Sequence, residues 1–264
     1  MGSVRLDISD GVGLITIDRP EKLNALTLAM YEQLGQAFAE VRDDPRVGVA
    51  ILTGAGERAF CVGADLGESI PALTSGRFDI SEWDAAHQKH SKLDKPVIAA
   101  INGWCLGGGF EIVLSTDIRI AAESATFALP ETGVGVVPAG GTLVRLVRQI
   151  PYAWAMDLML RGAPIDAATA LRYGILNRVV PDAELRDAAL EVAEQLLSRS
   201  RTAVATVKRS VRDLADLPLD EAFRQEAVLG QVAFTSDDAR EGLAAFAERR
   251  PPAFPSRTVL PHGS

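Results

Sequence analysis

The first apolar positions of the chain form two short runs around a tight-turn signal. Residues 4–8 and 12–17 are rich in β-branched side chains and flank Asp10-Gly11. An Asp-Gly pair between two such runs is typical of a two-residue β-turn. The pattern therefore predicts an N-terminal β-hairpin.

A helical pattern follows the hairpin. Thr27 is a good helix N-cap, since its hydroxyl can accept a hydrogen bond from an amide in the first helical turn. The apolar residues after it recur every three or four positions until Asp43-Asp44-Pro45, and they are Met30, Leu34, Phe38 and Val41. This spacing predicts a helix with one buried face.

Further apolar runs alternate with helices and then give way to them. Residues 48–53, 96–101, 117–121 and 125–129 read as short strands, and a helix is expected from Gly107 onward. From Leu143 to about Ala247 the spacing is that of amphipathic helices, with one strand at residues 175–180. This order predicts an α/β fold with a helical C-terminal part.

Composition narrows the class of protein. The chain has 264 residues, 47% of them hydrophobic, and a net charge of −8. This acidic balance argues against a nucleic-acid partner, which needs a basic surface. No apolar run approaches the roughly 20 residues that span a bilayer, so we expect no membrane partner. In the absence of a secretory signal pattern, we expect a cytoplasmic protein.

The cysteines and histidines do not form a recognisable motif. Cys61 and Cys105 cannot build a disulfide framework, and we expect them to be reduced thiols that pack as small apolar side chains. His87 and His90 lie three positions apart on a predicted helix, without a further ligand motif. We therefore expect solvated histidines and no metal. Phosphate-loop and serine-elbow motifs are also absent.

Two glutamates stand in stretches that otherwise exclude charge. Glu111 interrupts the apolar run 107–114, and Glu131 lies between Pro130 and the glycine-rich residues 133–141. A carboxylate in apolar surroundings costs several kcal/mol unless it is paired, hydrogen-bonded or protonated. Two such residues beside flexible loops indicate a site where protons are moved.

Two small-residue segments can offer backbone N–H groups to a ligand. Gly107-Gly108-Gly109 opens a helix, and the first N–H groups of a helix have no internal partner. Glycine also lets a ligand oxygen approach closely. Residues 60–66 leave the N–H of Ala64 accessible. The alternatives are close helix–strand packing for the glycines and an ordinary strand-to-helix connection for residues 60–66.

The order of these motifs resembles the crotonase superfamily, which contains enoyl-CoA hydratases and isomerases. The likeness covers nearly the whole chain, in order, at residues 19–26, 60–66, 95–103, 106–111, 130–131, 135–142, 170–180 and 246–251. It implies a ClpP-like spiral of ββα turns over residues 1–195. It also implies a helical oligomerisation region over residues 196–264, which assembles a homotrimer or a homohexamer built as a dimer of trimers.

The resemblance also implies a reaction. The substrate would be an acyl-CoA thioester, with coenzyme A as part of the substrate and no further cofactor. The N–H groups of Ala64 and Gly108 would form an oxyanion hole for the thioester oxygen. Glu111 would orient and activate water, and Glu131 would transfer the proton at Cα. Hydratases of the superfamily have both glutamates, so the resemblance implies an enoyl-CoA hydratase, a lyase of the kind used in fatty acid metabolism.

Contacts with CoA and the acyl group carry over by position, with two departures. The expected residues are Lys22, Asn24, Ala25, Ala64, Asp65, Leu66, Gly108, Phe246 and Arg249, the last of these from a neighbouring subunit. Many relatives have a lysine after the Asp-Leu pair, where this chain has Gly67. The loop 138–142 is one residue shorter than in many relatives, which bears on the size of the acyl pocket.

Three alternatives stay open from the sequence. One is a dehydratase of a specialised acyl-CoA, such as a carnitinyl-type substrate. Another is a Δ3,Δ2-enoyl-CoA isomerase, in which Glu131 alone moves the proton. The third is a non-catalytic acyl-CoA-binding or RNA-binding relative, against which the two retained carboxylates and the acidic charge argue.

Overall fold

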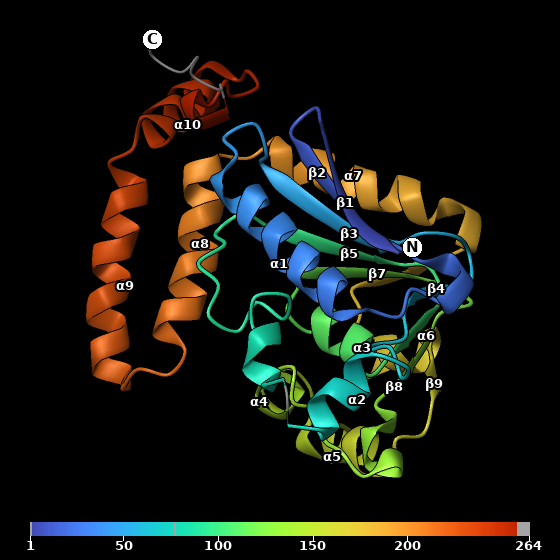
Figure 1. Cartoon of the computed structure of the whole chain (residues 1–264). Coiled ribbons are helices and arrows are strands. Elements are labelled where there is room, and N and C mark those ends of the chain that lie inside the picture. The colour runs from blue at the N-terminus through green and yellow to red at the C-terminus, as the bar shows by residue number, and fades with distance from the viewer. Residues whose placement is uncertain (1, 77, 258–264) are drawn as a thin grey trace.

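A computed structural model describes residues 2–76 and 78–257 (Figure 1). Its larger sheet has six strands in the order β1-β2-β3-β5-β7-β10. The first two strands form the antiparallel hairpin that the Asp-Gly turn predicts, and the others run parallel. The strands are β1 (Ser3–Ser9), β2 (Val12–Asp18), β3 (Val49–Gly54), β5 (Val97–Ile101), β7 (Ile118–Ala122) and β10 (Arg178–Val180).

A second sheet of short strands lies beside the first, in the order β4-β6-β8-β9. These strands are β4 (Ala59–Cys61), β6 (Trp104–Leu106), β8 (Thr126–Ala128) and β9 (Ile165–Asp166). Three successive strand pairs of the chain, β3–β4, β5–β6 and β7–β8, follow the same course. In each pair the first strand joins the larger sheet and the second joins the smaller sheet. The α/β class and the spiral of repeating turns that the sequence predicts are confirmed.

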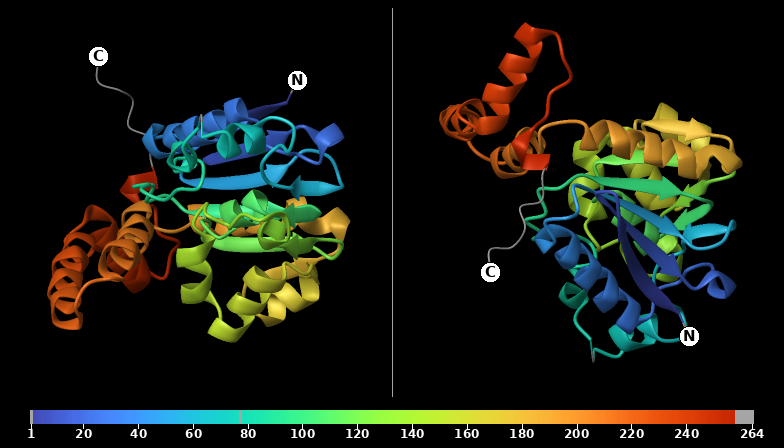
Figure 2. Two further views of the ribbon diagram at one scale, coloured as in Figure 1. Left: turned by 60° about the horizontal axis from the view of Figure 1, so that its bottom comes forward. Right: turned by 90° about the horizontal axis from the view of Figure 1, so that it is seen from above.

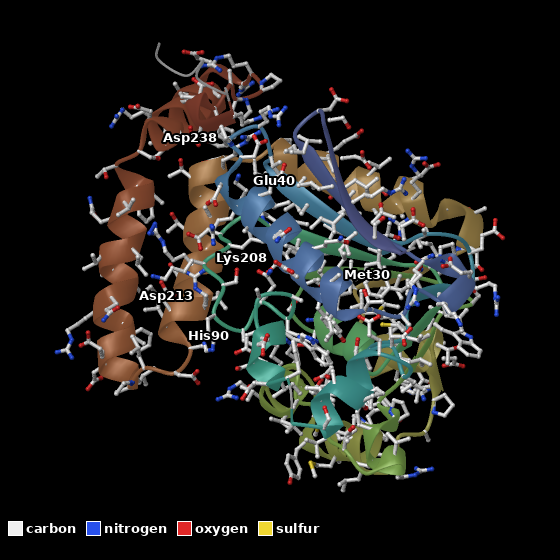
Figure 3. All side chains as sticks on the ribbon, viewed as in Figure 1. Met30, Glu40, His90, Lys208, Asp213 and Asp238 are labelled. Atoms are coloured by element: carbon white, nitrogen blue, oxygen red, sulfur yellow. The ribbon has the colours of Figure 1, made fainter. Side chains whose placement is uncertain are left out.

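Helix α1 (Leu28–Asp43) covers one face of the large sheet. The hydroxyl of Thr27 accepts a hydrogen bond from the amide of Met30 at 3.2 Å, which confirms the predicted N-cap. All four apolar residues of the predicted stripe are buried; Figure 3 labels Met30, near one end of this helix. Helix α7 (Leu185–Leu197) covers the other face, where it packs against β3, β5 and β7.

The remaining helices divide into two groups. Near the second sheet lie α2 (Ser69–Thr74), α3 (Gly108–Val113), α4 (Thr142–Gln149), α5 (Tyr152–Arg161) and α6 (Ala167–Arg172). At the C-terminal end α8 (Arg201–Leu214), α9 (Leu219–Phe234) and α10 (Asp237–Glu248) stand beside the sheets, and α9 stands furthest out (Figures 1 and 2). The domain boundary expected at residue 195 falls inside α7.

A partly exposed ion pair ties this helical arm to the sheet. Lys208 of α8 forms a salt bridge of 2.6 Å with Asp117 and donates a hydrogen bond of 2.8 Å to the carbonyl of Lys95 (Figure 3). Asp117 in turn accepts a hydrogen bond of 2.7 Å from the amide of Val97, at the start of β5. The arm is therefore anchored at the ends of β5 and β7.

Short strands are the part of the fold that the apolar pattern misses. β4, β6 and β9 have three residues or fewer, too few for a period to show. The strand expected at residues 175–180 is also shorter, since only Arg178–Val180 pairs with β7.

No helix of the described residues is long and apolar enough to cross a membrane.

We predict that Gly109→Ala destabilises the fold. A Cβ at this position would lie 2.1 Å from the carbonyl oxygen of Cys61, because α3 packs directly on β4. Overpacking of this kind costs about 1–3 kcal/mol or more. Gly230→Ala in α9 is the matched control, since no described heavy atom lies within 4 Å of its Cβ position. Urea denaturation should show a loss for the first variant and none for the second; equal stabilities would contradict this packing.

Candidate active site

The backbone around Ala64 leaves one N–H without a partner among the described residues. Leu26 pairs with this loop as in a parallel sheet: its amide donates to the carbonyl of Gly63 at 2.8 Å, and its carbonyl accepts from the amide of Asp65 at 2.9 Å. This pattern uses the residues on either side of Ala64. Among the described residues, the N–H of Ala64 itself donates to no backbone group.

The first residue of α3 offers a second free N–H beside it. Gly108 begins the helix, so its N–H has no intrahelical acceptor. A Cβ built on Gly108 would lie 3.7 Å from the nitrogen of Ala64 and 3.4 Å from the Cα of Gly63. The two N–H groups therefore border one small space. The structure brings these predicted oxyanion donors together.

Glycine is needed at Gly63 for this approach. Its φ of +87° lies in the left-handed region, and a Cβ there would lie 2.8 Å from the nitrogen of Gly108. The sequence left close helix–strand packing as the alternative role of the three glycines. Gly109 has that role, because it provides the close contact of α3 with β4.

Glu111 lies in the first turn of α3 and is 5% exposed. One carboxylate oxygen accepts a hydrogen bond of 3.3 Å from the amide of Thr142, at the start of α4. Burial raises the pKa of this carboxyl above its usual value, while hydrogen bonds from Thr142 and from the backbone amide of Gly140 act in the opposite direction. The loop 138–142 thus holds Glu111 in place.

Glu131 lies in the 3₁₀ turn η3 (Pro130–Val134) and is partly buried. Its Oε1 would lie 2.9 Å from a Cβ on Gly107, the residue before Gly108. Its Oε2 has no hydrogen-bond partner in the described part of the chain. Burial, together with the charge of Glu111, raises the pKa of Glu131 to about 7. The charge of Glu111 acts on Glu131, so the two carboxyl groups titrate as an interacting pair.

Asn24 is a correction to the expected ligand contacts. Its side chain is fully buried and accepts from the amide of Arg19 at 2.9 Å. It also donates to the carbonyls of Ala55 and Ala59 at 3.0 and 2.8 Å. With no exposed surface, this side chain fixes the loop and does not reach a ligand. Ala25, 8% exposed, contributes its carbonyl to a bond from Arg19 at 3.1 Å.

The Asp65 carboxylate is also used within the protein. It forms a salt bridge of 2.6 Å with Arg19 and accepts hydrogen bonds from the amides of Gly67 and Glu68. The bond from Arg19 holds the pKa of Asp65 below its usual value. This pair fastens residues 19–26 to the loop that carries Ala64, so Asp65 positions that loop.

The other expected ligand contacts lie on the surface. Lys22 is exposed at the end of a 3₁₀ turn, and Leu66 is 77% exposed beside Ala64. Phe246 and Arg249 lie on and just after α10, at the far end of the molecule from β4 (Figure 1). One chain does not bring these two residues to the glutamates.

His87 is a second correction. It is 1% exposed, not solvated, and lies against Gly140, whose Cβ position is 2.4 Å from the His87 Nε2. His90 is solvated as expected (Figure 3).

The sequence interpretation also overlooked Tyr31, a buried phenol beside Gly108. The sequence did offer a signal for Tyr31, since a tyrosine next to the apolar stripe of α1 is expected to be buried. A buried tyrosine hydroxyl needs a hydrogen-bond partner, which makes it a candidate for binding a ligand.

Both cysteines are buried free thiols, as the sequence predicts. Burial raises the pKa of Cys61 to about 12, and it also raises that of Cys105. Neither is a nucleophile at neutral pH. The described residues contain no cluster of His, Cys, Asp and Glu suited to a metal ion. A hollow lies between α7 and the face of the large sheet that α7 covers, and neither Glu111 nor Glu131 lines it.

This arrangement suits the polarisation of a carbonyl next to a proton transfer. Two backbone N–H groups can stabilise negative charge on an oxygen, and two carboxyl groups of raised pKa can exchange protons with the adjacent carbons and with water.

Comparison with known proteins assigns this geometry to a family. The sequence profile of the enoyl-CoA hydratase/isomerase family matches residues 7–257. Carnitinyl-CoA dehydratase of Escherichia coli K12 is 40% identical over 263 residues, which cover 97% of this chain and 99% of the relative. Enoyl-CoA hydratase EchA19 of Mycobacterium tuberculosis is 42% identical over 249 residues, covering 92% and 93% of the two chains.

A solved structure shows the same fold. The enoyl-CoA hydratase of Bacillus anthracis superposes with a TM-score of 0.90 at 35% identity, covering 96% of this chain and 99% of that one.

We predict that Glu111→Gln lowers the apparent pKa of Glu131. The variant removes the neighbouring negative charge, so ionisation of Glu131 becomes easier and its pKa falls below about 7. The fall is partial, because burial remains the larger cause. Carbon NMR of protein labelled at the glutamate carboxyls follows this titration. Glu40→Gln, on the exposed side of α1, is the control; an unchanged or higher pKa in Glu111→Gln would refute the coupling.

Proposed function

Since the chain belongs to the enoyl-CoA hydratase/isomerase family, we propose that it is a hydro-lyase that adds water reversibly across the double bond of a trans-2-enoyl-CoA. The observation that carries this proposal is the pair Glu111 and Glu131 beside the free N–H groups of Ala64 and Gly108. An isomerase needs one carboxyl group, whereas hydration needs a proton removed from water and another delivered to carbon.

The thioester oxygen accepts hydrogen bonds from the N–H groups of Ala64 and Gly108. As water attacks Cβ, electron density moves through the double bond onto this oxygen. The two donors stabilise the resulting enolate, and loss of one such donor typically costs about 3–4 kcal/mol. Because the donors belong to the backbone, the glycines at positions 63 and 108 determine their placement.

The two carboxyl groups divide the proton transfers. The Glu111 carboxylate accepts a proton from water while the water oxygen bonds to Cβ. Protonated Glu131 then delivers its proton to Cα, which gives a 3-hydroxyacyl-CoA and returns the thioester carbonyl. The pKa of about 7 keeps a proton on Glu131 in a large fraction of molecules at neutral pH. Bonds to Glu111 from Thr142 and Gly140 favour its carboxylate form.

A dehydratase of a specialised 3-hydroxyacyl-CoA is the second candidate. It is favoured by the relative named carnitinyl-CoA dehydratase, which matches this chain over almost its whole length. The same groups perform this reaction in reverse. An isomerase would leave Glu111 without a role, although that residue is held by two amides of the loop 138–142.

We predict that Glu111→Gln and Glu131→Gln each lower kcat by at least about 100-fold, the range expected for general acid–base groups. Loss of crotonyl-CoA absorbance, from its conjugated thioester, measures the rate. Binding of the substrate should persist in both variants, because the oxyanion donors are backbone groups. Glu40→Gln should keep the wild-type rate. Near-normal hydration by either active-site variant would disprove the two-carboxylate mechanism.

The helical arm is proposed to assemble the oligomer. Helix α9 buries none of its residues, although several of them are apolar. The exposed apolar residues of the arm are Val207, Val211, Leu219, Phe223, Val228, Val232, Phe234, Leu243 and Phe246. Such a concentration of exposed apolar side chains marks an association surface. Assembly would also carry Phe246 and Arg249 of one subunit toward the CoA site of another.

For this surface we predict a trimer or hexamer of the 28.1 kDa chain in light scattering after gel filtration. Phe223→Glu combined with Val232→Glu, in α9, should shift the population to smaller species, since two charges would be buried in the contact. Glu226→Gln, on the same helix, is the control. A monomeric wild-type protein would overturn the assembly and leave the proposed reaction standing.

A further inference from the structure

Several buried polar side-chain atoms near the glutamates have no hydrogen-bond partner among the described residues, Trp83 Nε1 and Thr142 Oγ1 among them. Two that can serve one ligand group are the hydroxyl of Tyr31, 2% exposed, and Nε2 of His87, 1% exposed. Buried polar groups are nearly always hydrogen-bonded, and an unpaired group destabilises the fold. Groups left unpaired at an active site are candidates for binding a substrate.

Tyr31 reaches the oxyanion end of the site from α1. Its hydroxyl oxygen lies 2.8 Å from the Cβ position of Gly108, the residue whose N–H is a proposed donor. Burial, with the nearby charges of Cys61, Glu111 and Glu131, raises the pKa of this phenol well above its usual value. The hydroxyl is therefore neutral and can donate a hydrogen bond.

His87 presents an acceptor beside Tyr31, with the two ring centroids 5.6 Å apart. Its Nδ1 lies 3.0 Å from the carbonyl oxygen of Trp83. A carbonyl only accepts, so Nδ1 carries the hydrogen and Nε2 keeps a free lone pair. Burial lowers the pKa of His87 to about 4, so the ring is neutral. Nε2 faces Gly140, whose amide is one of the donors to Glu111.

The protein holds both side chains in fixed positions. The ring of Tyr31 stacks on the ring of Trp83, with their centroids 4.1 Å apart. The backbone carbonyl of Trp83 accepts the hydrogen bond from Nδ1 of His87. Arg145 donates to the carbonyls of His87 and Gln88 at 2.7 and 2.9 Å. Gln88 has a φ of +55°, a conformation unfavourable for this residue. Long-range bonds and local strain thus position a donor and an acceptor that the fold does not pair.

A hydroxyl satisfies a donor and an acceptor together with a single atom and its hydrogen. We propose that Tyr31 and His87 form a subsite for a hydroxyl carried by the acyl chain beyond Cβ, which accepts from Tyr31 and donates to His87. This inference rests on the proposed function, since it names the acyl class that the hydratase prefers. A methyl group of the same size would leave both protein groups buried and unpaired, so the site discriminates against it.

The test compares enoyl-CoA esters that differ only in hydroxyl and methyl. The first pair is 4-hydroxybut-2-enoyl-CoA and pent-2-enoyl-CoA, and the second is 5-hydroxypent-2-enoyl-CoA and hex-2-enoyl-CoA. The wild-type enzyme should show a kcat/KM at least about ten-fold higher for the hydroxyl member of one pair. Tyr31→Phe should reduce this ratio at least about ten-fold. Tyr152→Phe, at a tyrosine that is 69% exposed, should leave it unchanged.

A ratio of one or less in both pairs would overturn the subsite, and so would an unchanged ratio in Tyr31→Phe. Either result leaves hydratase activity intact, whereas failure of the wild-type enzyme to hydrate any ester would reject the proposed function instead. Thermal unfolding adds a second readout. Removal of an unpaired buried hydroxyl should keep or raise the Tm of Tyr31→Phe; a lower Tm would assign the hydroxyl to the fold and contradict the subsite.

Discussion

The close approach of two backbone segments is the constraint on which the rest of the site depends. The loop at Gly63 and Ala64 and the start of α3 come so near that side chains at positions 63 and 109 would collide with main-chain atoms, and one at position 108 would collide with the hydroxyl of Tyr31. This contact places two unpaired N–H groups together. It also directs the first turn of α3, and with it Glu111, into the interior. The Arg19–Asp65 pair and the buried side chain of Asn24 brace the loop from its other side.

Burial of the carboxyl groups follows from that geometry and supplies the chemistry. A glutamate on the first turn of a helix that packs against a sheet cannot reach bulk water, so its charged form is disfavoured. Glu131 feels both its own burial and the charge of Glu111, which is why its pKa rises to about 7. The fold offsets the cost at Glu111 with amides from the loop 138–142. A pair of this kind can release and accept protons near neutral pH.

Much of this organisation is predictable from the sequence, because it depends on local patterns. The Asp-Gly hairpin, the Thr27 cap, the strands of the large sheet and the two out-of-place glutamates all have local signatures. The short strands β4, β6 and β9 have none, since two or three residues carry no period. The burial of His87 depends on Arg145, 58 positions away, and the inward bonds of Asn24 reach residues more than 30 positions away. Such contacts exist only in the folded chain.

The most direct test of the account is hydration of crotonyl-CoA in deuterated water, followed by NMR of the product. Two carboxyl groups that act on one face of the double bond predict a 3-hydroxyacyl-CoA with a single deuterium at Cα, placed syn to the new hydroxyl. Deuterium in an unhydrated product, or an anti arrangement of deuterium and hydroxyl, would contradict the roles assigned to Glu111 and Glu131.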